Sequence, residues 1–305
     1  MGKLRELYLG GLRVFFRNTF DVWQRLGFSV IPLHYYQPIP ETRTLSEELW
    51  EKRSELPGLV MNEEEQIEFL SVVQKKYKDE YDAFPRDKTE KKHEFYMNND
   101  AFGSVDAEVL YCVIRHFKPR RIIEIGSGYS TYLSAKAIRK NNEEDRAYDC
   151  ALTAIEPYPN KTLVKGFPGL TELVPMKVQS VPVSFFDKLV ENDILFIDSS
   201  HVLKLGGDVL YEYLDILPRL KKGVLVHIHD IFIPAEYPKD WVLKNRWFWT
   251  EQYLLQAFMA FNDSFKVLWA GSYMNHNHQD RLSLAFASFR KNGASPGSFW
   301  IRKTR

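Results

Sequence analysis

The feature that most constrains the fold is an alternation of two sequence patterns that begins near residue 100. Short apolar runs, rich in β-branched residues, alternate with longer stretches in which apolar residues recur at helical spacing. Such an alternation is typical of a parallel sheet covered by helices on both faces, so the expected fold class is α/β. We predict strands at residues 120–126, 152–157, 172–178, 193–200, 223–230, 265–273 and 298–303. We predict helices at about residues 104–117, 130–140, 206–220 and 250–262.

Residues 1–99 lack this alternation of strand and helix patterns, and we expect them to form a mostly helical and irregular extension to a domain of residues 100–305. Residues 3–27 mix apolar positions at helical spacing with basic side chains, which predicts an amphipathic helix weakened by Gly10 and Gly11. One interpretation is that this helix packs on its own domain or on a second subunit, which would make a homodimer. The other is peripheral contact with a membrane surface. The extension as a whole is expected to cover the substrate or to mediate oligomerisation.

Charge and cysteine content narrow the class of protein. The net charge of +1 gives no electrostatic case for a nucleic-acid partner. Only two cysteines are present, both inside apolar stretches, so we expect no disulfide framework and a reducing, cytoplasmic compartment. No apolar run approaches the roughly 18–20 residues that a membrane-spanning helix requires.

The first strand ends in a turn, "EIGSGYST", that contains Gly126, Ser127 and Gly128. Glycines at this point let the backbone turn tightly and approach a ligand, and the free N–H groups of the following helix would face the same crevice. A dinucleotide-binding turn would have a third small residue where this chain has Thr131, so a nicotinamide cofactor is disfavoured. Two glycines alone are equally typical of an ordinary strand-to-helix turn.

The second strand ends at Glu156, whose carboxylate could accept hydrogen bonds from the two hydroxyls of a ribose. Glu156 lies later in the chain than the roughly 20-residue spacing of a compact unit. The polar insert of residues 139–149 accounts for the difference. An exposed glutamate at the end of a surface strand is the alternative interpretation.

Polar side chains also follow the fourth and fifth strands. Asp198 and His201 end the fourth, and His227, His229 and Asp230 end the fifth. Because the carboxyl ends of parallel strands meet at one edge of a sheet, we expect these side chains to form one cluster. A histidine beside carboxylates suits general-base catalysis, and the same set suits a divalent metal. His227 is expected to be a supporting residue inside the strand.

Residues 231–258 follow this strand end and contain three of the seven tryptophans, Trp241, Trp247 and Trp249. A long aromatic segment directly after a functional strand end is typical of a lid over a substrate. Core packing of the same aromatic side chains is the alternative.

Together, "IIEIGSGYST", "AIEP", "ILFIDSSH" and "VHIHDI" resemble the class I S-adenosylmethionine-dependent methyltransferases, in the branch called methyltransferase 24. The resemblance covers roughly residues 95–303. It implies a Rossmann-like sheet of seven strands with the last strand antiparallel, and S-adenosylmethionine as cofactor. It also implies that the glycine turn borders the methionine part of the cofactor and that Glu156 holds its ribose. The cofactor-binding candidates are therefore Glu124, Gly126, Ser127, Gly128, Ser130, Glu156 and Asp198.

A narrower resemblance is to metal-dependent sugar O-methyltransferases, which have Asp-x-x-His at the fourth strand and an acidic pair at the fifth. Asp198 and His201 match the first motif, but His229 stands where the pair would have a carboxylate before Asp230. The resemblance makes Asp198, His229 and Asp230 the candidate ligands for a divalent metal, Mg²⁺ or another. The extra histidine could favour a softer metal, or none.

The expected function is O-methylation of a hydroxyl on a small molecule, such as a sugar or a glycosylated metabolite. The catalytic candidates are His201 as the base, with Asp198 and Asp230 either holding a metal or orienting His201. Nothing at the strand ends separates oxygen from nitrogen acceptors, so N-methylation of a small molecule stays open. A protein that keeps the fold for binding without catalysis is a further alternative.

Overall fold

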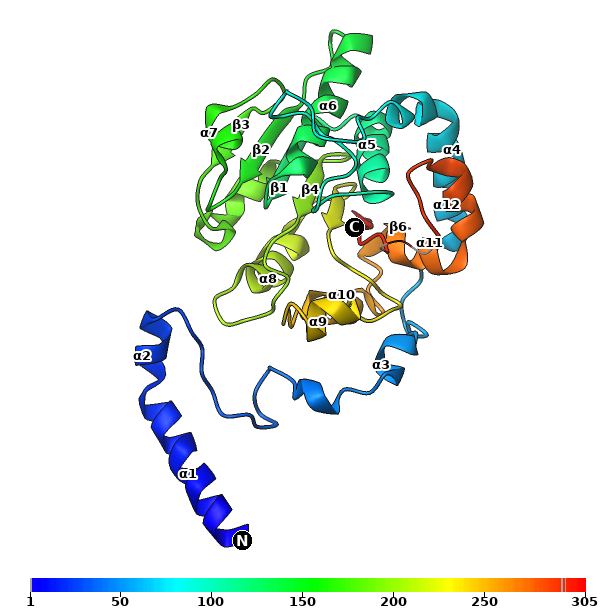
Figure 1. Cartoon of the computed structure of the whole chain (residues 1–305). Coiled ribbons are helices and arrows are strands. Elements are labelled where there is room, and N and C mark those ends of the chain that lie inside the picture. The colour runs from blue at the N-terminus through cyan, green and yellow to red at the C-terminus, as the bar shows by residue number, and fades with distance from the viewer. Residues whose placement is uncertain (1, 292, 294) are drawn as a thin grey trace. The chain divides into compact units, whose positions relative to one another are not determined.

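The chain divides into two compact units in its computed structural model, which describes residues 2–291, 293 and 295–305. The N-terminal unit is residues 1–49, and the sheet unit is residues 50–305. The division differs from the expected boundary after residue 99, because residues 50–99 belong with the sheet. Figure 1 shows the helices and strands of both units.

The N-terminal unit contains the predicted amphipathic helix as two pieces, α1 (Gly2–Asn18) and α2 (Phe20–Arg25). The helix continues through Gly10 and Gly11 and is interrupted instead at Thr19, whose hydroxyl donates to the Phe15 carbonyl oxygen at 2.9 Å. A short 3-10 helix, Thr42–Thr44, follows, and α3 (Glu48–Glu51) spans the junction with the sheet unit. No helix in the described part of the chain has the length and apolar character needed to cross a membrane.

The sheet unit contains the seven strands that were expected, and their order in the sheet is β3-β2-β1-β4-β5-β7-β6. β7 is antiparallel to both of its neighbours, and the remaining pairs are parallel. β1 therefore lies between β2 and β4, where the strand order reverses and an open α/β sheet binds its ligands. The strands are β1 (Arg121–Ile125), β2 (Ala151–Ile155), β3 (Glu172–Val174), β4 (Ile194–Ile197), β5 (Leu225–Ile228), β6 (Phe265–Ala270) and β7 (Phe299–Lys303).

Helices cover both faces of this sheet (Figure 1). The predicted helix at 206–220 is broken into α8, a π-helical turn at Glu212–Ile216 and a 3-10 turn at Leu217–Arg219 that contains Pro218. The predicted strand at 265–273 ends at Ala270, where α11 begins. The helices of the sheet unit are α4 (Glu63–Asp82), α5 (Asp106–Phe117), α6 (Tyr129–Glu144), α7 (Lys161–Lys165), α8 (Asp208–Tyr211), α9 (Lys239–Leu243), α10 (Glu251–Met259), α11 (Gly271–Asn277) and α12 (Gln279–Ala285).

Two hydrophobic cores, one on each face of the sheet, follow from the two-residue period of the strands. Ile122 of β1 packs into the core shared with α4, α5 and α6, whereas its neighbour Ile123 packs into the core shared with α8 and α10. Every residue of β4 and β5 is buried, as expected for central strands covered on both faces.

α4 is held on the sheet unit by polar contacts as well as by its apolar face. The guanidinium of Arg115 on α5 is only 2% exposed and lies 2.8 Å from the carboxylate of Glu80 on α4. The hydroxyl of Tyr81 donates to the Ala285 carbonyl oxygen at 3.1 Å. These contacts explain why the highly charged residues around 75–94 are part of the sheet unit.

Candidate functional site

The glycine turn after β1 has a backbone that only glycine can adopt at its first position. Gly126 has a φ of +79°, and a Cβ placed on it would lie 1.9 Å from the backbone oxygen of Asp198. Its neighbour Ser127 donates its backbone N–H to Glu156 at 3.3 Å. The backbone N–H of Gly128 donates to the hydroxyl of Thr131 at 3.0 Å. Thr131 thus satisfies a free N–H at the start of α6, a role that a third small residue could not perform.

Glu124 is fully buried directly beneath this turn. Its Oε1 accepts a hydrogen bond from the Ser130 hydroxyl at 2.5 Å. Its Oε2 and the Ser127 hydroxyl have no hydrogen-bond partner among the described residues. Burial raises the pKa of Glu124 to about 8, although Ser130 opposes the shift. The turn therefore presents unsatisfied polar atoms to whatever binds there.

This pKa predicts a specific pH dependence of stability. A carboxyl whose folded pKa is raised stabilises the fold when protonated, and that contribution is lost as the pH rises from its unfolded value towards about 8. Glu124→Gln keeps the acceptor for Ser130 but cannot ionise. We expect its Tm to rise relative to the wild type between pH 5 and about pH 8, measured by thermal unfolding at several pH values. Parallel curves for the two proteins would contradict this assignment.

A cavity of about 460 Å³ opens at the ends of β1, β2 and β4. Its volume is in the range of small-molecule and cofactor sites. It is bordered by the glycine turn, by Glu156 at the end of β2 and by Asp198 at the end of β4. Glu156 is half-buried, and its Oε1 accepts a hydrogen bond from the backbone N–H of Tyr158 at 2.7 Å. The predicted cofactor-binding residues are thus gathered at one edge of the sheet.

A second, larger cavity of about 670 Å³ borders Asp230 at the end of β5. Its wall includes aromatic side chains from the segment that precedes α4 and from the segment that follows β5. The aromatic lining residues are Trp50, Phe232, Tyr237, Trp241 and Phe289. Charged and polar lining residues include Arg53, Glu236, His276, Ser288, Arg290 and Ser295.

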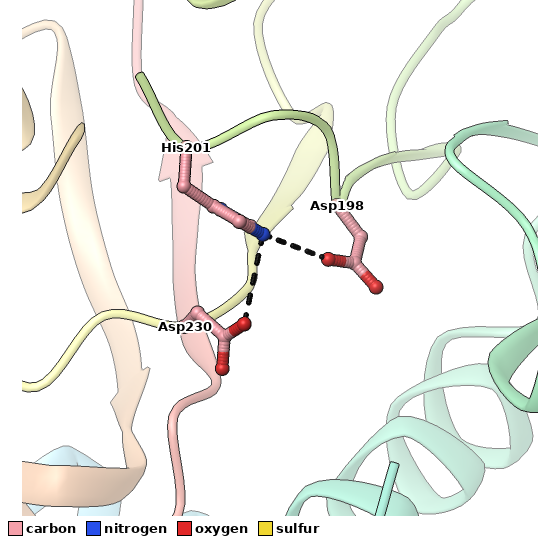
Figure 2. A group of neighbouring side chains, drawn as sticks. All are labelled: Asp198, His201 and Asp230. Atoms are coloured by element: carbon pink, nitrogen blue, oxygen red, sulfur yellow. Dashed lines mark ion pairs between the residues drawn. The ribbon is translucent and has the colours of Figure 1, made fainter. Parts of the chain in front are cut away.

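Asp198, His201 and Asp230 point towards one another (Figure 2). Asp198 borders the smaller cavity, and Asp230 borders the larger one. His201 Nε2 lies 3.2 Å from Asp198 Oδ1 and 3.6 Å from Asp230 Oδ2. One ligand atom from each residue lies within 4.8 Å of the other two, a spacing that could hold a metal ion. His201 and Asp230 both have positive φ values, 57° and 55°, and such backbone strain is concentrated at functional sites.

The group of side chains that could hold a metal differs in one residue from the predicted ligands. His229 points its Nδ1 towards Nε2 of His227 at 3.3 Å, and its Nε2 is 3.8 Å from Asp230 Oδ1. His201, not His229, completes the group with Asp198 and Asp230. His227 is fully buried in β5, and burial lowers its pKa well below the ordinary value, which agrees with a supporting role.

Glu251, at the start of α10, is a site residue that the sequence did not reveal. It is fully buried, and its Oε2 accepts a hydrogen bond from His201 Nδ1 at 2.9 Å. Its position is fixed by the turn after β4, because the backbone N–H groups of Thr250 and Glu251 both donate to the His201 carbonyl oxygen. Glu251 lies fifty residues from His201 in a segment without a motif, so no local pattern could have identified it.

This environment determines the protonation of His201. Burial lowers its pKa, but the hydrogen bonds and charges of Asp198 and Glu251 outweigh burial and raise the pKa well above the ordinary value. Burial also raises the pKa of Asp230, against the opposing effect of His229. A raised pKa favours the protonated imidazole, which cannot accept a proton, and this argues against the predicted role of His201 as the base.

The aromatic segment after β5 packs against this cluster. The rings of Trp247 and Trp249 stack at 5.1 Å, and the Trp249 ring lies 4.4 Å from the ring of His201. Trp241 contacts both tryptophans and also lines the larger cavity. The tryptophans of residues 231–258 are therefore packed against one another and against the cluster, and the role of this segment as a lid stays a prediction.

Glu251 is expected to fix the orientation of His201. In Glu251→Gln we expect the affinity for a divalent metal to fall about 10–100-fold, because a partner that orients a metal-binding histidine typically contributes that much. Titration calorimetry with Mn²⁺ or Co²⁺ measures the affinity directly. Glu212→Gln is the matched control, since Glu212 is equally buried but bonds Ser199 at 3.0 Å instead of His201. Equal affinity in Glu251→Gln and the wild type would remove Glu251 from the site.

Comparison with known proteins identifies the family. The sequence model of the family described as "Methyltransferase domain" matches residues 123–231, which include the glycine turn and both acidic strand ends. The chain belongs to the class I S-adenosylmethionine-dependent methyltransferases. This methyltransferase is 36% identical over 188 residues to a protein of Archaeoglobus fulgidus named "Uncharacterized protein". The match covers 59% of this chain and 82% of the relative. A solved structure titled "CmcI-N160 apo-structure" aligns at 15% identity with a TM-score of 0.38, covering 74% of this chain and 84% of that one.

The glycine turn of the methyltransferase fits the cofactor of this family. Gly126 keeps the turn clear of a side chain, and the unpartnered oxygen of Glu124 can accept a hydrogen bond from an ammonium group. Glu156 supplies two carboxylate oxygens at the rim of the smaller cavity. Two carboxylates and an imidazole in the Asp198 cluster are likewise donors that suit a divalent cation.

Proposed function

We propose that the chain is a metal-assisted O-methyltransferase that acts on a hydroxyl of a small molecule, a sugar or a glycosylated metabolite. The observation that carries the proposal is the position of the acidic cluster between two cavities. Asp198 borders the smaller cavity, where the cofactor residues lie, and Asp230 borders the larger one. An acceptor in the larger cavity would therefore meet the cofactor at this cluster.

The two cavities would bind different molecules, the smaller one the cofactor and the larger one the acceptor. S-adenosylmethionine supplies the methyl group as an electrophile on its sulfonium sulfur. The chain has to hold the acceptor hydroxyl in line and remove its proton. Gly126, Glu124 and Glu156 bind the cofactor on the side of β1 and β2. The larger cavity holds the acceptor and, through its aromatic walls, excludes water.

Asp230 is our candidate for the base. Nε2 of His201 would be a ligand when a metal is present, so its lone pair would not be available to accept a proton. Asp230 borders the larger cavity, and its carboxylate has two oxygens, so that one can bind a metal while the other accepts the proton. A divalent metal held by Asp198, His201 and Asp230 would lower the pKa of a bound hydroxyl.

The lining of the larger cavity supports an acceptor with both apolar and polar faces. Trp50, Tyr237 and Trp241 present flat aromatic surfaces, and Glu236 and Ser295 present hydrogen-bonding groups. Sugar rings offer C–H faces and hydroxyls that match such a mixture.

Metal removal tests the chemistry. After dialysis against EDTA we expect methyl transfer to fall to background and to return on addition of Mg²⁺, Mn²⁺ or Co²⁺. Binding of S-adenosylhomocysteine, measured by calorimetry, is expected to survive the dialysis, which separates loss of catalysis from loss of the fold. Full activity in the metal-free protein would overturn the metal-assisted part of the proposal.

The acceptor atom is tested separately with paired glycosides that differ only by a hydroxyl or an amine at one position. We expect methylation of the hydroxyl compound, identified by mass spectrometry of the product. Methylation confined to the amine would establish N-methyl transfer instead.

A further inference from the structure

Residues 9–49 of the N-terminal unit, whose side chains the structure describes, include many apolar side chains but form no buried core. Within residues 9–49 no described side chain is buried. Large apolar side chains that are more than a third exposed are unusually frequent in this short stretch. They are Leu9, Val14, Phe15, Val22, Leu26, Phe28, Leu33, Tyr35, Tyr36, Ile39 and Leu49. An exposed apolar surface of this density is typical of a segment that binds another surface.

Basic residues accompany this apolar surface. Residues 2–28 contain five basic and two acidic residues, a net charge of +3 within a chain whose total is +1. Arg13 and Arg17 lie one helical turn apart on α1. Neither has an acidic partner within ion-pair distance among the described residues. The two arginines are therefore available to an anionic partner.

The two arginines border a groove within the N-terminal unit. The groove has a volume of about 550 Å³, and its floor is formed by Phe20 and by the extended segment of residues 30–32. Cationic groups at the rim of an apolar groove match a molecule with an anionic head and an apolar body. Exposed aromatic residues near the groove, such as Tyr35 and Tyr36, have the amphipathic side chains that favour the interface between water and lipid.

We propose that residues 9–39 bind the surface of a membrane that contains anionic lipids. Arg13 and Arg17 contact lipid phosphates, while Phe15, Leu26 and Phe28 insert between the acyl chains. Such binding uses two weak contributions, apolar insertion and electrostatic attraction, which together give stable attachment of an interfacial helix.

A second copy of the chain is a poorer occupant of the same surface. In a two-fold dimer the same patch meets itself, so a segment of net charge +3 would face a second segment of net charge +3. Like charges facing each other across an interface oppose association. An anionic bilayer provides the opposite charge over an extended plane, and it places no shape requirement on the exposed side chains.

Vesicle sedimentation with the full chain tests the proposal. We expect binding to phosphatidylcholine vesicles that contain phosphatidylglycerol, weakening as salt is added, and no binding to phosphatidylcholine alone. The double variant Arg13→Gln with Arg17→Gln should bind the anionic vesicles roughly 20-fold more weakly, since each basic residue near an anionic surface contributes about fivefold. Phe15→Ser with Phe28→Ser should weaken binding at every salt concentration.

Matched controls separate this effect from a general loss of charge. Arg146 and Arg281 are exposed arginines of the sheet unit, and their double replacement by Gln should leave vesicle binding unchanged. The Arg13 and Arg17 variant should keep wild-type affinity for S-adenosylhomocysteine. Equal binding to neutral and anionic vesicles, competition by inorganic phosphate alone, or dimers in light scattering without vesicle binding would each overturn the proposal.

Discussion

Gly126→Ala is expected to abolish cofactor binding and to destabilise the sheet unit by about 3 kcal/mol or more. The added Cβ would lie 1.9 Å from the backbone oxygen of Asp198, and the residue has a φ of +79° that an alanine side chain disfavours. The clash is with backbone, so no side-chain rotation can relieve it. The ends of β1 and β4 would have to separate, and the cofactor residues lie on those two ends.

Gly128→Ala is the matched control for stability. Its φ of −177° is extended backbone, and a Cβ there would meet nothing within 4 Å. We therefore expect the unfolding free energy of Gly128→Ala to stay close to the wild-type value in urea denaturation. Titration of both variants with S-adenosylhomocysteine then measures the cofactor site itself. A Gly126→Ala protein with wild-type stability and affinity would contradict the geometry of the turn.

The strands of the sheet could be predicted from the sequence, because each is a short apolar run that stands out from its surroundings. β4 is a continuous apolar run, and β5 is apolar apart from His227. A polar residue follows the end of each strand, and the glycine turn marks the switch point. Parallel pairing then brings those ends together without any further information. The boundary after residue 49 could not be predicted in this way, because the sequence of α4 is that of a charged surface helix. Only the structure shows that Glu80 of α4 pairs with the buried Arg115.

The composition of the cluster depended on backbone geometry that residue types do not encode. His201 and His229 each lie next to an aspartate or three residues from one, so both were reasonable ligands. The positive φ of His201 turns its side chain back towards Asp198, whereas His229 is engaged with His227 inside the sheet. Glu251 reaches the site from α10 through tertiary contacts alone. These are the long-range contacts that patterns within one segment cannot reveal.

Asp230→Asn is expected to lower kcat by roughly 10²–10⁴-fold while the affinity for S-adenosylhomocysteine stays unchanged. Asp230 is the one carboxylate of the cluster that borders the larger cavity, in which we propose that the acceptor binds. Asparagine keeps the size of the side chain but cannot accept the proton. His201→Ala should also impair turnover, but through loss of metal affinity, so that raised metal concentrations recover part of its activity. No metal concentration should rescue Asp230→Asn to the wild-type rate. Asp240→Asn, at an exposed aspartate of α9 that pairs with Lys244, provides the control and should keep full activity. If excess metal restored Asp230→Asn completely, Asp230 would be only a ligand, and the proton would have to leave by another group.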